Sequence, residues 1–370
     1  MRKTLVILTP GFPKDEEDSA WIPDRQIFVR VLKEANPDLN IIVLAFQYPL
    51  KPAEYSWNGV KVIALGGKNK GGFYRRFIWL RAWRELKKIR AAYDTIGLLS
   101  FWMDECAFIA DRFAKRYTIK HYCWLLGQDA RPGNKYVYLM MPNGDNLIAL
   151  SDFIVDEFHR NYGVVPKHLA TGAIDPSLFK TFTGERDIDV MGAGSLIGLK
   201  QYSVFIDVIH ALKNDMPQIK AAICGTGPEM RSLQTKINKL GLEDNITLTG
   251  ELPHAEVLAL MQRAKVFLHT SKYEGFGIVC LEALYAGAKV ISFVQPMKNE
   301  IPNWHIATDA TDMTRMAKDV LFDDNPLYNP VLPYHVADTA KTIIELYTQQ
   351  EAAIAPIRPP MAPNESVDLK

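Results

Sequence analysis

Two carboxylates and two glycines stand at the entrance of an apolar helical run in the stretch YEGFGIVCLEALYAG, residues 273–287. Glu274 and Glu282 lie eight positions apart, with Gly275 and Gly277 between them. Glycine lets a backbone approach a ligand closely, and a helix N-terminus favours an anion, so the amides after Gly277 are candidates for binding a phosphate. Carboxylates beside a phosphate accept hydrogen bonds from hydroxyl groups, which predicts a sugar nucleotide as the ligand. The alternative is that both acids are ordinary charges near a helix N-terminus.

A second glycine-rich stretch, GAGSLIGLKQ at residues 192–201, follows an apolar run and opens another helical pattern. Lys200 can place a cation on a pyrophosphate, with Gly194 allowing the turn. The stretch also resembles a dinucleotide fingerprint, but Ile197 stands where a glycine is needed, so nicotinamide binding is not expected. Asp-Ile-Asp at 187–189 has metal-binding spacing but begins an apolar strand, so no metal is expected there.

The elements that would position these residues alternate along the chain. Short apolar runs, from TLVILTPG to AKVISF, are separated by amphipathic helical patterns such as RQIFVRVLKEA at residues 25–35 and AFIADRFAKRY at 107–117. Uniformly apolar strands between such helices are typical of a parallel sheet covered on both faces, and ligands bind such sheets at the carboxyl ends of the strands. The alternation restarts after the middle of the chain. We therefore predict an α/β fold with two Rossmann-like parallel-sheet domains that face a cleft.

Turn-forming residues and composition set the expected boundaries. We expect one domain over residues 1–175 and another over 185–330, with the turn-rich stretch 171–186 as linker. A helix over 333–353 would follow and could cross back to the first domain, and the proline-rich tail 356–370 is expected to be disordered.

The overall composition is that of a soluble globular protein, with 48 % hydrophobic residues, 23 % charged residues and a formal net charge of +1. Neither this charge nor a recognised module indicates a nucleic-acid partner, and none is expected. The first apolar run stops at Pro10, and no stretch reaches the roughly 18 apolar residues of a membrane span, so we expect a cytoplasmic protein. Four cysteines without zinc-ligand spacing are expected to be core thiols: Cys106, Cys123, Cys224 and Cys280.

The segment KNKGGFYRRFIWLRAWRELKKIR, residues 68–90, carries nine Lys or Arg against one acid. Its tryptophans fall on one helical stripe with Leu86 and Ile89. Such a helix can lie on an anionic membrane, on the inner face of the cell membrane in this case, with its aromatic residues at headgroup level. It can equally pack the stripe on the sheet and expose the charges to water. The residues that would contact a membrane are Arg75, Arg76, Trp79, Arg81, Trp83 and Arg84.

The stretch SKYEGFGIVCLEALYAGAKVIS resembles the signature EGFGxxxLEAxxxGxxVI of family 4 retaining glycosyltransferases, which have the GT-B fold. The resemblance is detailed over residues 190–295. It implies that Glu282 binds the ribose hydroxyls of the donor and that Glu274 contacts the transferred sugar. It also implies that the amides of residues 277–279 hold the pyrophosphate.

Two further segments resemble motifs of the same family with substitutions. GAGSLIGLKQ resembles GRLxxxKG, in which an arginine and a lysine neutralise the leaving diphosphate; Ser195 replaces the arginine, Lys200 is kept, and Gln201 replaces the second glycine. WLLGQDARPG resembles HGxD, with Leu126 in place of the histidine. Asp129 in this segment would either orient an acceptor hydroxyl or cap a turn.

The resemblance implies a retaining enzyme that moves a hexose-type sugar from a nucleotide-diphosphate donor to a glycan or lipid-linked acceptor. Cell-surface polysaccharide or lipopolysaccharide assembly is the implied context, with no metal or other cofactor. The first domain would bind the acceptor and the second the donor, with Glu274 and Lys200 as the catalytic residues. The alternatives are a 2-epimerase or phosphorylase-like enzyme that uses no such acceptor, and a catalytically silent sugar-nucleotide-binding subunit.

The resemblance implies a donor site in which the main chain around Glu251 and Leu252 contacts the base. The site as a whole would consist of Gly11, Gly194, Ser195, Lys200, Gly225, Gly227, Glu251, Leu252, Glu274, Gly275, Phe276, Gly277, Ile278, Val279 and Glu282. The expected acceptor side consists of Gly127, Gln128 and Asp129.

Overall fold

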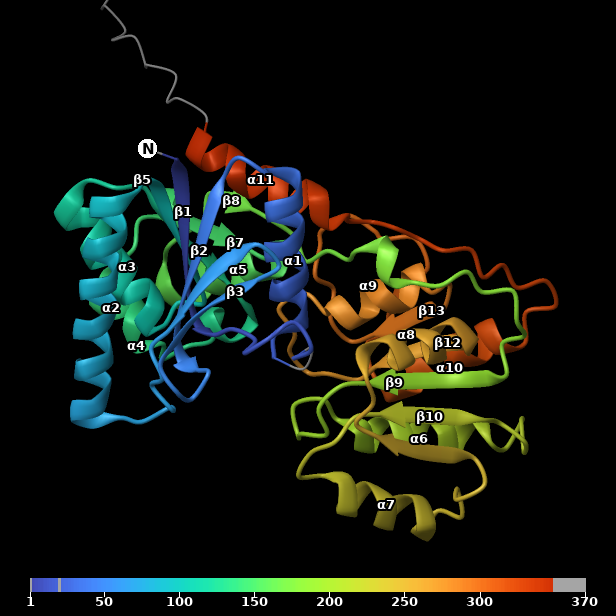
Figure 1. Ribbon diagram of the computed structural model, residues 1–370. Coiled ribbons are helices and arrows are strands. Elements are labelled where there is room, and N and C mark those ends of the chain that lie inside the picture. The colour runs from blue at the N-terminus through green and yellow to red at the C-terminus, as the bar shows by residue number, and fades with distance from the viewer. Residues whose placement is uncertain (1, 19–20, 349–370) are drawn as a thin grey trace, which may run out of the picture.

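Two sheets, each flanked by helices, make up the computed structural model, which describes residues 2–18 and 21–348 (Figure 1). The sheets lie side by side, so the molecule has two lobes. The first lobe contains β1 (Lys3–Gly11), α1 (Pro23–Ala35), β2 (Asn40–Tyr48), β3 (Ala53–Trp57), β4 (Val60–Ala64), α2 (Gly72–Ala92), β5 (Asp94–Phe101), α3 (Glu105–Tyr117), β6 (His121–Leu125), α4 (Lys135–Met140), β7 (Leu147–Ala149), α5 (Asp152–Tyr162) and β8 (His168–Leu169).

The first sheet has the strand order β3-β4-β2-β1-β5-β6-β7-β8. Its strands pair in parallel, except that β3 runs antiparallel to β4. Strand β3 was not predicted from the sequence. Asn58 and Gly59 join β3 to β4 with φ of 44° and 72°, the left-handed conformation that an Asn-Gly hairpin turn requires. This dipeptide could have indicated the β3–β4 hairpin.

The second sheet has the order β11-β10-β9-β12-β13-β14, and all its strand pairs are parallel. The predicted α/β fold with two parallel-sheet units is therefore confirmed. The second lobe contains β9 (Ile188–Ala193), α6 (Tyr202–Leu212), β10 (Ala221–Cys224), α7 (Met230–Lys239), β11 (Ile246–Gly250), α8 (His254–Arg263), β12 (Ala264–His269), α9 (Ile278–Tyr285), β13 (Lys289–Ser292), β14 (Trp304–Ile306) and α10 (Ala310–Leu321).

The central strands are buried on both faces, as their uniformly apolar sequences predict. Residues 5–8 of β1 and 266–268 of β12 are almost completely inaccessible to solvent. Each such Val, Leu, Ile or Phe side chain contributes about 1.5–3 kcal/mol of burial free energy, so these strands fix the core of each lobe. All four cysteines are buried free thiols, which confirms the prediction made for them.

Helix α11 (Val336–Thr348) crosses back from the second lobe and packs on the first (Figure 1). It contacts α1, and the hydroxyl of Tyr347 donates to the carbonyl of Leu98 in β5 at 2.7 Å. The Tyr347 ring fills the space that a side chain at Gly97 would occupy. The predicted crossing is thus confirmed. Residues 349–353 of the predicted helix and the predicted tail 356–370 lie outside the described residues.

The tryptophans of α2 face the core of the first lobe. Trp79 packs on Phe108 and donates its Nε1–H to Glu105 at 2.6 Å. Trp83 packs edge-on against Phe113 with ring centroids 5.1 Å apart. The expectation that these two indoles contact a membrane is therefore corrected, because the apolar stripe packs on the sheet side of the helix.

The opposite side of α2 carries both charge and exposed apolar surface. Arg76 and Arg84 are exposed. Phe73, Phe77 and Leu80 are 87 %, 52 % and 59 % exposed. The other two arginines of the predicted membrane set have internal partners: Arg75 lies 3.7 Å from a Glu105 carboxylate oxygen, and Arg81 donates to the Leu65 carbonyl at 3.4 Å. Among the described residues no helix is long and apolar enough to cross a membrane.

Candidate functional site

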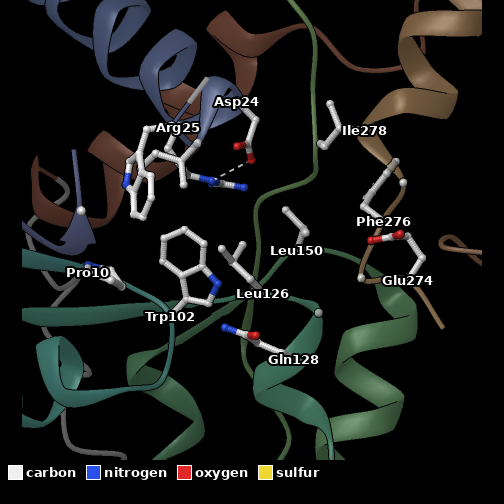
Figure 2. Close-up of a pocket in the computed structure, with 16 residues that line it drawn as sticks. Pro10, Asp24, Arg25, Trp102, Leu126, Gln128, Leu150, Glu274, Phe276 and Ile278 are labelled. Atoms are coloured by element: carbon white, nitrogen blue, oxygen red, sulfur yellow. Dashed lines mark hydrogen bonds and ion pairs between the residues drawn. The ribbon is translucent and has the colours of Figure 1, made fainter. Parts of the chain in front are cut away.

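A cavity of about 480 Å³ lies between the two lobes, where the carboxyl ends of β1, β5, β6 and β7 face the loop after β12 (Figure 2). This is the edge at which parallel sheets bind ligands. The first lobe contributes Pro10, Gly11, Trp21, Ile22, Asp24, Arg25, Trp102, Leu126, Gly127, Gln128 and Leu150, and the second contributes Glu274, Gly275, Phe276, Gly277 and Ile278. The cavity therefore gathers residues from both the expected donor site and the expected acceptor side.

The two lobes touch at a pair of glycines. A Cβ atom on Gly275 would lie 2.7 Å from both the nitrogen and the Cα of Gly127. Next to this contact Ser151 donates to the Gly275 carbonyl at 2.5 Å, and the hydroxyl of Tyr273 donates to the Gly127 carbonyl at 2.8 Å. Gly275 thus has a packing function beyond the phosphate approach expected of it: it lets the lobes close on one another.

Gly277 positions the start of α9. Its φ of 88° lies in the left-handed region, and it precedes Ile278, the first residue of the helix. No side chain caps this helix N-terminus within the described residues, so its first amides have no side-chain acceptor. Phe276 is buried against Trp304 and Tyr334, with ring centroids 6.4 and 5.6 Å away, so its side chain serves mainly to hold the loop.

Glu274 is an ionised carboxylate between two basic side chains. It forms an ion pair with Lys200, and one of its oxygens lies 3.5 Å from Nε2 of His269. Burial opposes ionisation, but the hydrogen bond from His269 and the charge of Lys200 outweigh it and lower the pKa of Glu274 to about 2. Burial lowers the pKa of His269, and its Nε2 also lies 3.3 Å from the hydroxyl oxygen of Ser271.

Lys200 lies in the turn between β9 and α6. Its carbonyl accepts from the hydroxyl of Thr270 at 2.7 Å, which ties this turn to the end of β12. Gln201, the next residue, has φ 51° and ψ 42° and so adopts the left-handed conformation, which glycine adopts most easily. The resembled motif has a glycine at this position. Ser195, at the position of the missing arginine, is exposed.

Glu282 lies beside a different part of the site. Its carboxylate is 2.7 Å from Nε2 of His254, the first residue of α8. The hydrogen bond and charge of Glu282 raise the pKa of His254 despite partial burial. His254 follows closely on exposed Glu251 and half-buried Leu252, so the expected ribose carboxylate adjoins the segment expected to contact the base.

The remaining glycines of the expected donor site bring loops together. A Cβ on Gly225 would collide with the carbonyl of Gly194, and one on Gly227 would collide with the carbonyl of Leu196. The loops after β9 and β10 can therefore stack only because these positions lack side chains. Neither these glycines nor Lys200, Val279 and Glu282 line the cavity, so the structure does not gather these expected donor residues in it.

Asp129 does not face the cavity. It is buried and accepts a hydrogen bond from the Leu126 amide at 2.8 Å. Burial raises its pKa to about 7, with that hydrogen bond acting in the opposite direction. Of the two alternatives, the structure supports turn capping. Gln128 is the exposed side chain of this segment that reaches the cavity.

Several site residues were not identified from the sequence: His254, His269, Trp21, Arg25 and Trp102. His269 ends the strand run VFLHTS, and a polar residue at a strand's carboxyl end was a usable signal. The others come from segments with no distinctive local pattern. Figure 2 shows Trp102 and Arg25 on the wall of the cavity opposite Glu274.

Known proteins resemble this chain in sequence and in fold. Residues 175–305 match the family model of glycosyl transferases group 1. The chain is 29 % identical over 103 residues to a 2-deoxystreptamine N-acetyl-D-glucosaminyltransferase of Niallia circulans, covering 28 % of this chain and 26 % of the relative. It is 24 % identical over 164 residues to a phosphatidylinositol N-acetylglucosaminyltransferase of Arabidopsis thaliana, covering 43 % and 37 %. The chain thus spans only about a quarter to two fifths of these relatives.

Solved structures resemble the whole chain. Sucrose-phosphate synthase of Thermosynechococcus elongatus has a TM-score of 0.70 at 16 % identity, covering 94 % of this chain and 95 % of that one. HepE of Anabaena, solved with UDP and glucose, has a TM-score of 0.65 at 15 % identity, covering 92 % and 94 %. These likenesses show that the chain has the expected GT-B fold.

Proposed function

We propose that the chain transfers a hexose-type sugar from a nucleotide-diphosphate donor to an acceptor, because residues 175–305 match the family model of glycosyl transferases group 1. The observation that carries the proposal is the placement of Glu274. This ionised carboxylate lines the cavity shared by both lobes and pairs with Lys200 on its second-lobe side. The donor would lie on the second lobe and the acceptor on the first.

Sugar transfer requires stabilisation of a departing diphosphate and of positive charge on the sugar. The free amides at the start of α9 and the ammonium of Lys200 provide positive electrostatic potential for the diphosphate. Glu274 accepts hydrogen bonds from the moving sugar and offsets its developing positive charge. The close contact of Gly275 with Gly127 joins the two lobes beside the cavity. Closure of the lobes around a bound donor would exclude water and so limit donor hydrolysis.

We propose a retaining reaction without a covalent enzyme intermediate. The carboxylates that line the cavity are Glu274 and Asp24, and each is paired with a cation, Lys200 and Arg25 respectively. Neither carboxylate can attack the sugar without giving up its ion pair. The acceptor would therefore attack from the side of the leaving group, and the donor phosphate would take its proton. Lys200 and the helix amides supply the positive charge in this scheme, without a bound metal.

The names of the relatives narrow the donors to test first. Two of the curated relatives are N-acetylglucosaminyltransferases by name, and HepE was solved with UDP and glucose. A UDP-linked hexose or N-acetylhexosamine is the donor we propose. A glycan or lipid-linked acceptor of cell-surface assembly is the proposed acceptor class, supported by the basic and apolar outer face of α2.

A two-step experiment tests the proposed function. Thermal shift with UDP-, GDP-, ADP- and CMP-sugars identifies the donor, because a ligand that binds only the folded state raises the unfolding temperature. Products are then analysed with and without candidate acceptors, with Glu282→Ala as the variant of weakened donor binding. Transfer that depends on the acceptor supports the proposal. An epimerised sugar, or tight binding without turnover, would support one of the two alternatives instead.

A further inference from the structure

Arg25 is a buried cation on the first-lobe wall of the cavity. It is 2 % exposed, its guanidinium carbon lies 3.9 Å from the centre of the Trp124 ring, and its Nε donates to Asp24 at 3.0 Å. Nη1 is buried and has no hydrogen-bond partner within residues 2–18 and 21–348. Figure 2 shows the guanidinium projecting toward the middle of the residues that line the cavity.

Trp21 places a second unused donor on the same wall. Its indole stacks on Tyr48 with ring centroids 4.5 Å apart and lies directly against Gly11 at the end of β1. Its Nε1–H is buried and has no partner in the described part of the chain. Trp21 and Arg25 both line the cavity, and each has a buried donor without an acceptor within the described residues.

Unpaired buried donors are costly, typically about 1–3 kcal/mol each and more for a charged group. A bound ligand with acceptor oxygens would remove this cost. Asp24 uses only Nε of Arg25, which leaves the outer edge of the guanidinium unused. That edge carries a planar fork of donors that matches a phosphate or a carboxylate.

The backbone around these donors supports a ligand site. Ile22 has φ 50° and Trp102 has φ 67°, conformations that are genuine outliers for β-branched and bulky residues, and both residues line the cavity. Ile22 is also the N-cap of α1 and offers no side-chain cap, so the positive end of this helix adds to the attraction for an anion.

We propose that Arg25 and Trp21 bind an anionic group of the acceptor, a phosphate or a carboxylate. The assignment of this anion to the acceptor rests on the proposed function. Both residues belong to the first lobe, whereas Lys200 and the first amides of α9, which are proposed to hold the donor diphosphate, belong to the second lobe. Asp24 neutralises the charge of Arg25. The ligand would accept hydrogen bonds from the Arg25 donors that Asp24 does not use.

The test measures binding of inorganic phosphate by isothermal titration calorimetry in chloride-matched buffer, with and without a saturating nucleoside diphosphate. The variants are Arg25→Gln, Arg25→Lys and Trp21→Phe. The last of these keeps an aromatic ring but removes the indole N–H donor. Arg116→Gln, at an exposed position of α3, is the matched control. Circular dichroism establishes that each variant is folded; if Arg25→Gln is not, the other two variants carry the test.

We expect Arg25→Gln to weaken phosphate binding at least tenfold with the nucleotide present, Arg25→Lys to restore it in part, and Trp21→Phe to weaken it several-fold. Nucleotide affinity should stay within about twofold of the parent in every variant. Phosphate binding unchanged in Arg25→Lys and Trp21→Phe would overturn the proposal. So would a loss of nucleotide affinity with phosphate binding intact, because the bound group would then be the donor's. A parent that binds phosphate but no nucleotide sugar would contradict the proposed function and leave the anion site standing.

Discussion

Lys200 and Glu274, 74 positions apart in the sequence, form an ion pair between the loop after β9 and the loop after β12. Their side chains are only 20 % and 24 % exposed, so the pair is screened less than a surface pair. Glu274 stays ionised, and Lys200 is held where the diphosphate of a donor would arrive. The pair therefore links the two predicted catalytic residues before any donor is bound.

Replacing Lys200 with Met should lower kcat by about 10²–10³-fold, because one preorganised group that stabilises the leaving charge is lost. Donor KM should change much less. The rate is measured at saturating donor and acceptor. Near-normal kcat in Lys200→Met would remove this residue from the mechanism.

The same pair predicts coupled stabilities. Lys200→Met should destabilise the fold by about 1–3 kcal/mol because it leaves Glu274 without its main cation, and Lys200→Met/Glu274→Gln should recover part of that loss. Chemical denaturation of the single and double variants gives the coupling energy. Lys236→Met removes a more exposed pair with Asp207 and should change stability by about 1 kcal/mol or less. Additive effects of the two site substitutions would mean that the pair is absent in solution.

His254 and Glu282 predict a pH dependence of donor binding. The raised pKa of His254 means that the protonated form, which holds Glu282 most tightly, is present below that pKa and is lost as pH rises through it. If Glu282 binds ribose hydroxyls, affinity for the donor's nucleoside should increase over this pH interval. His254→Gln should abolish the dependence. The nucleoside itself is the ligand for calorimetry, because it has no phosphate that titrates nearby. A parent profile as flat as that of His254→Gln would contradict the assignment of Glu282.

Gly275→Ala should hold the lobes apart, since the new methyl group would meet the Gly127 backbone at 2.7 Å. We expect slower sugar transfer and a larger fraction of donor lost to hydrolysis, because water enters the cleft. The ratio of free sugar to transferred sugar is the measurement. Gly71→Ala is the control, since a Cβ there meets nothing within 4 Å and its backbone is extended. An unchanged ratio in Gly275→Ala would mean that this contact does not govern closure.

The outer face of α2 predicts binding to anionic membranes. Phe73→Ser/Phe77→Ser should reduce co-sedimentation with liposomes that contain anionic lipid, and Arg76→Glu/Arg84→Glu should reduce it further at low salt. Phe322→Ser removes a similarly exposed phenylalanine from the second lobe and should have no effect. Equal sedimentation of all variants would show that the outer face of α2 does not bind anionic membranes.

The sequence predicted the features that are written locally. The loop between β12 and α9 could be identified because a strand, two glycines and a helix follow one another within residues 264–285. Lys200 could be proposed because it follows a strand in a glycine-rich turn. These signals depend on neighbours in the chain, so a single sequence is enough to read them.

The missing features depend on contacts between distant segments. Glu282 meets His254, 28 positions away in the sequence, only after the second sheet is assembled. Arg25 enters the site because β1 and α1 bring it opposite the second lobe, and nothing in its own helix distinguishes it from Arg30, which pairs with Asp175 instead. Helical periodicity predicted the apolar stripe of α2 correctly. It did not predict whether this stripe packs on the first lobe or faces a membrane.

The central claim is tested most directly by following one donor sugar. The donor that stabilises the protein most is supplied with a radiolabelled sugar, together with a total glycan and lipid extract, to the parent and to Glu274→Gln. We predict that the parent moves label into an acceptor with the anomeric configuration retained, and that Glu274→Gln binds the donor but transfers label at least about 100-fold more slowly. Equal transfer by both proteins would contradict the role of Glu274, and label that never leaves the nucleotide in the parent would contradict the proposed glycosyltransferase itself.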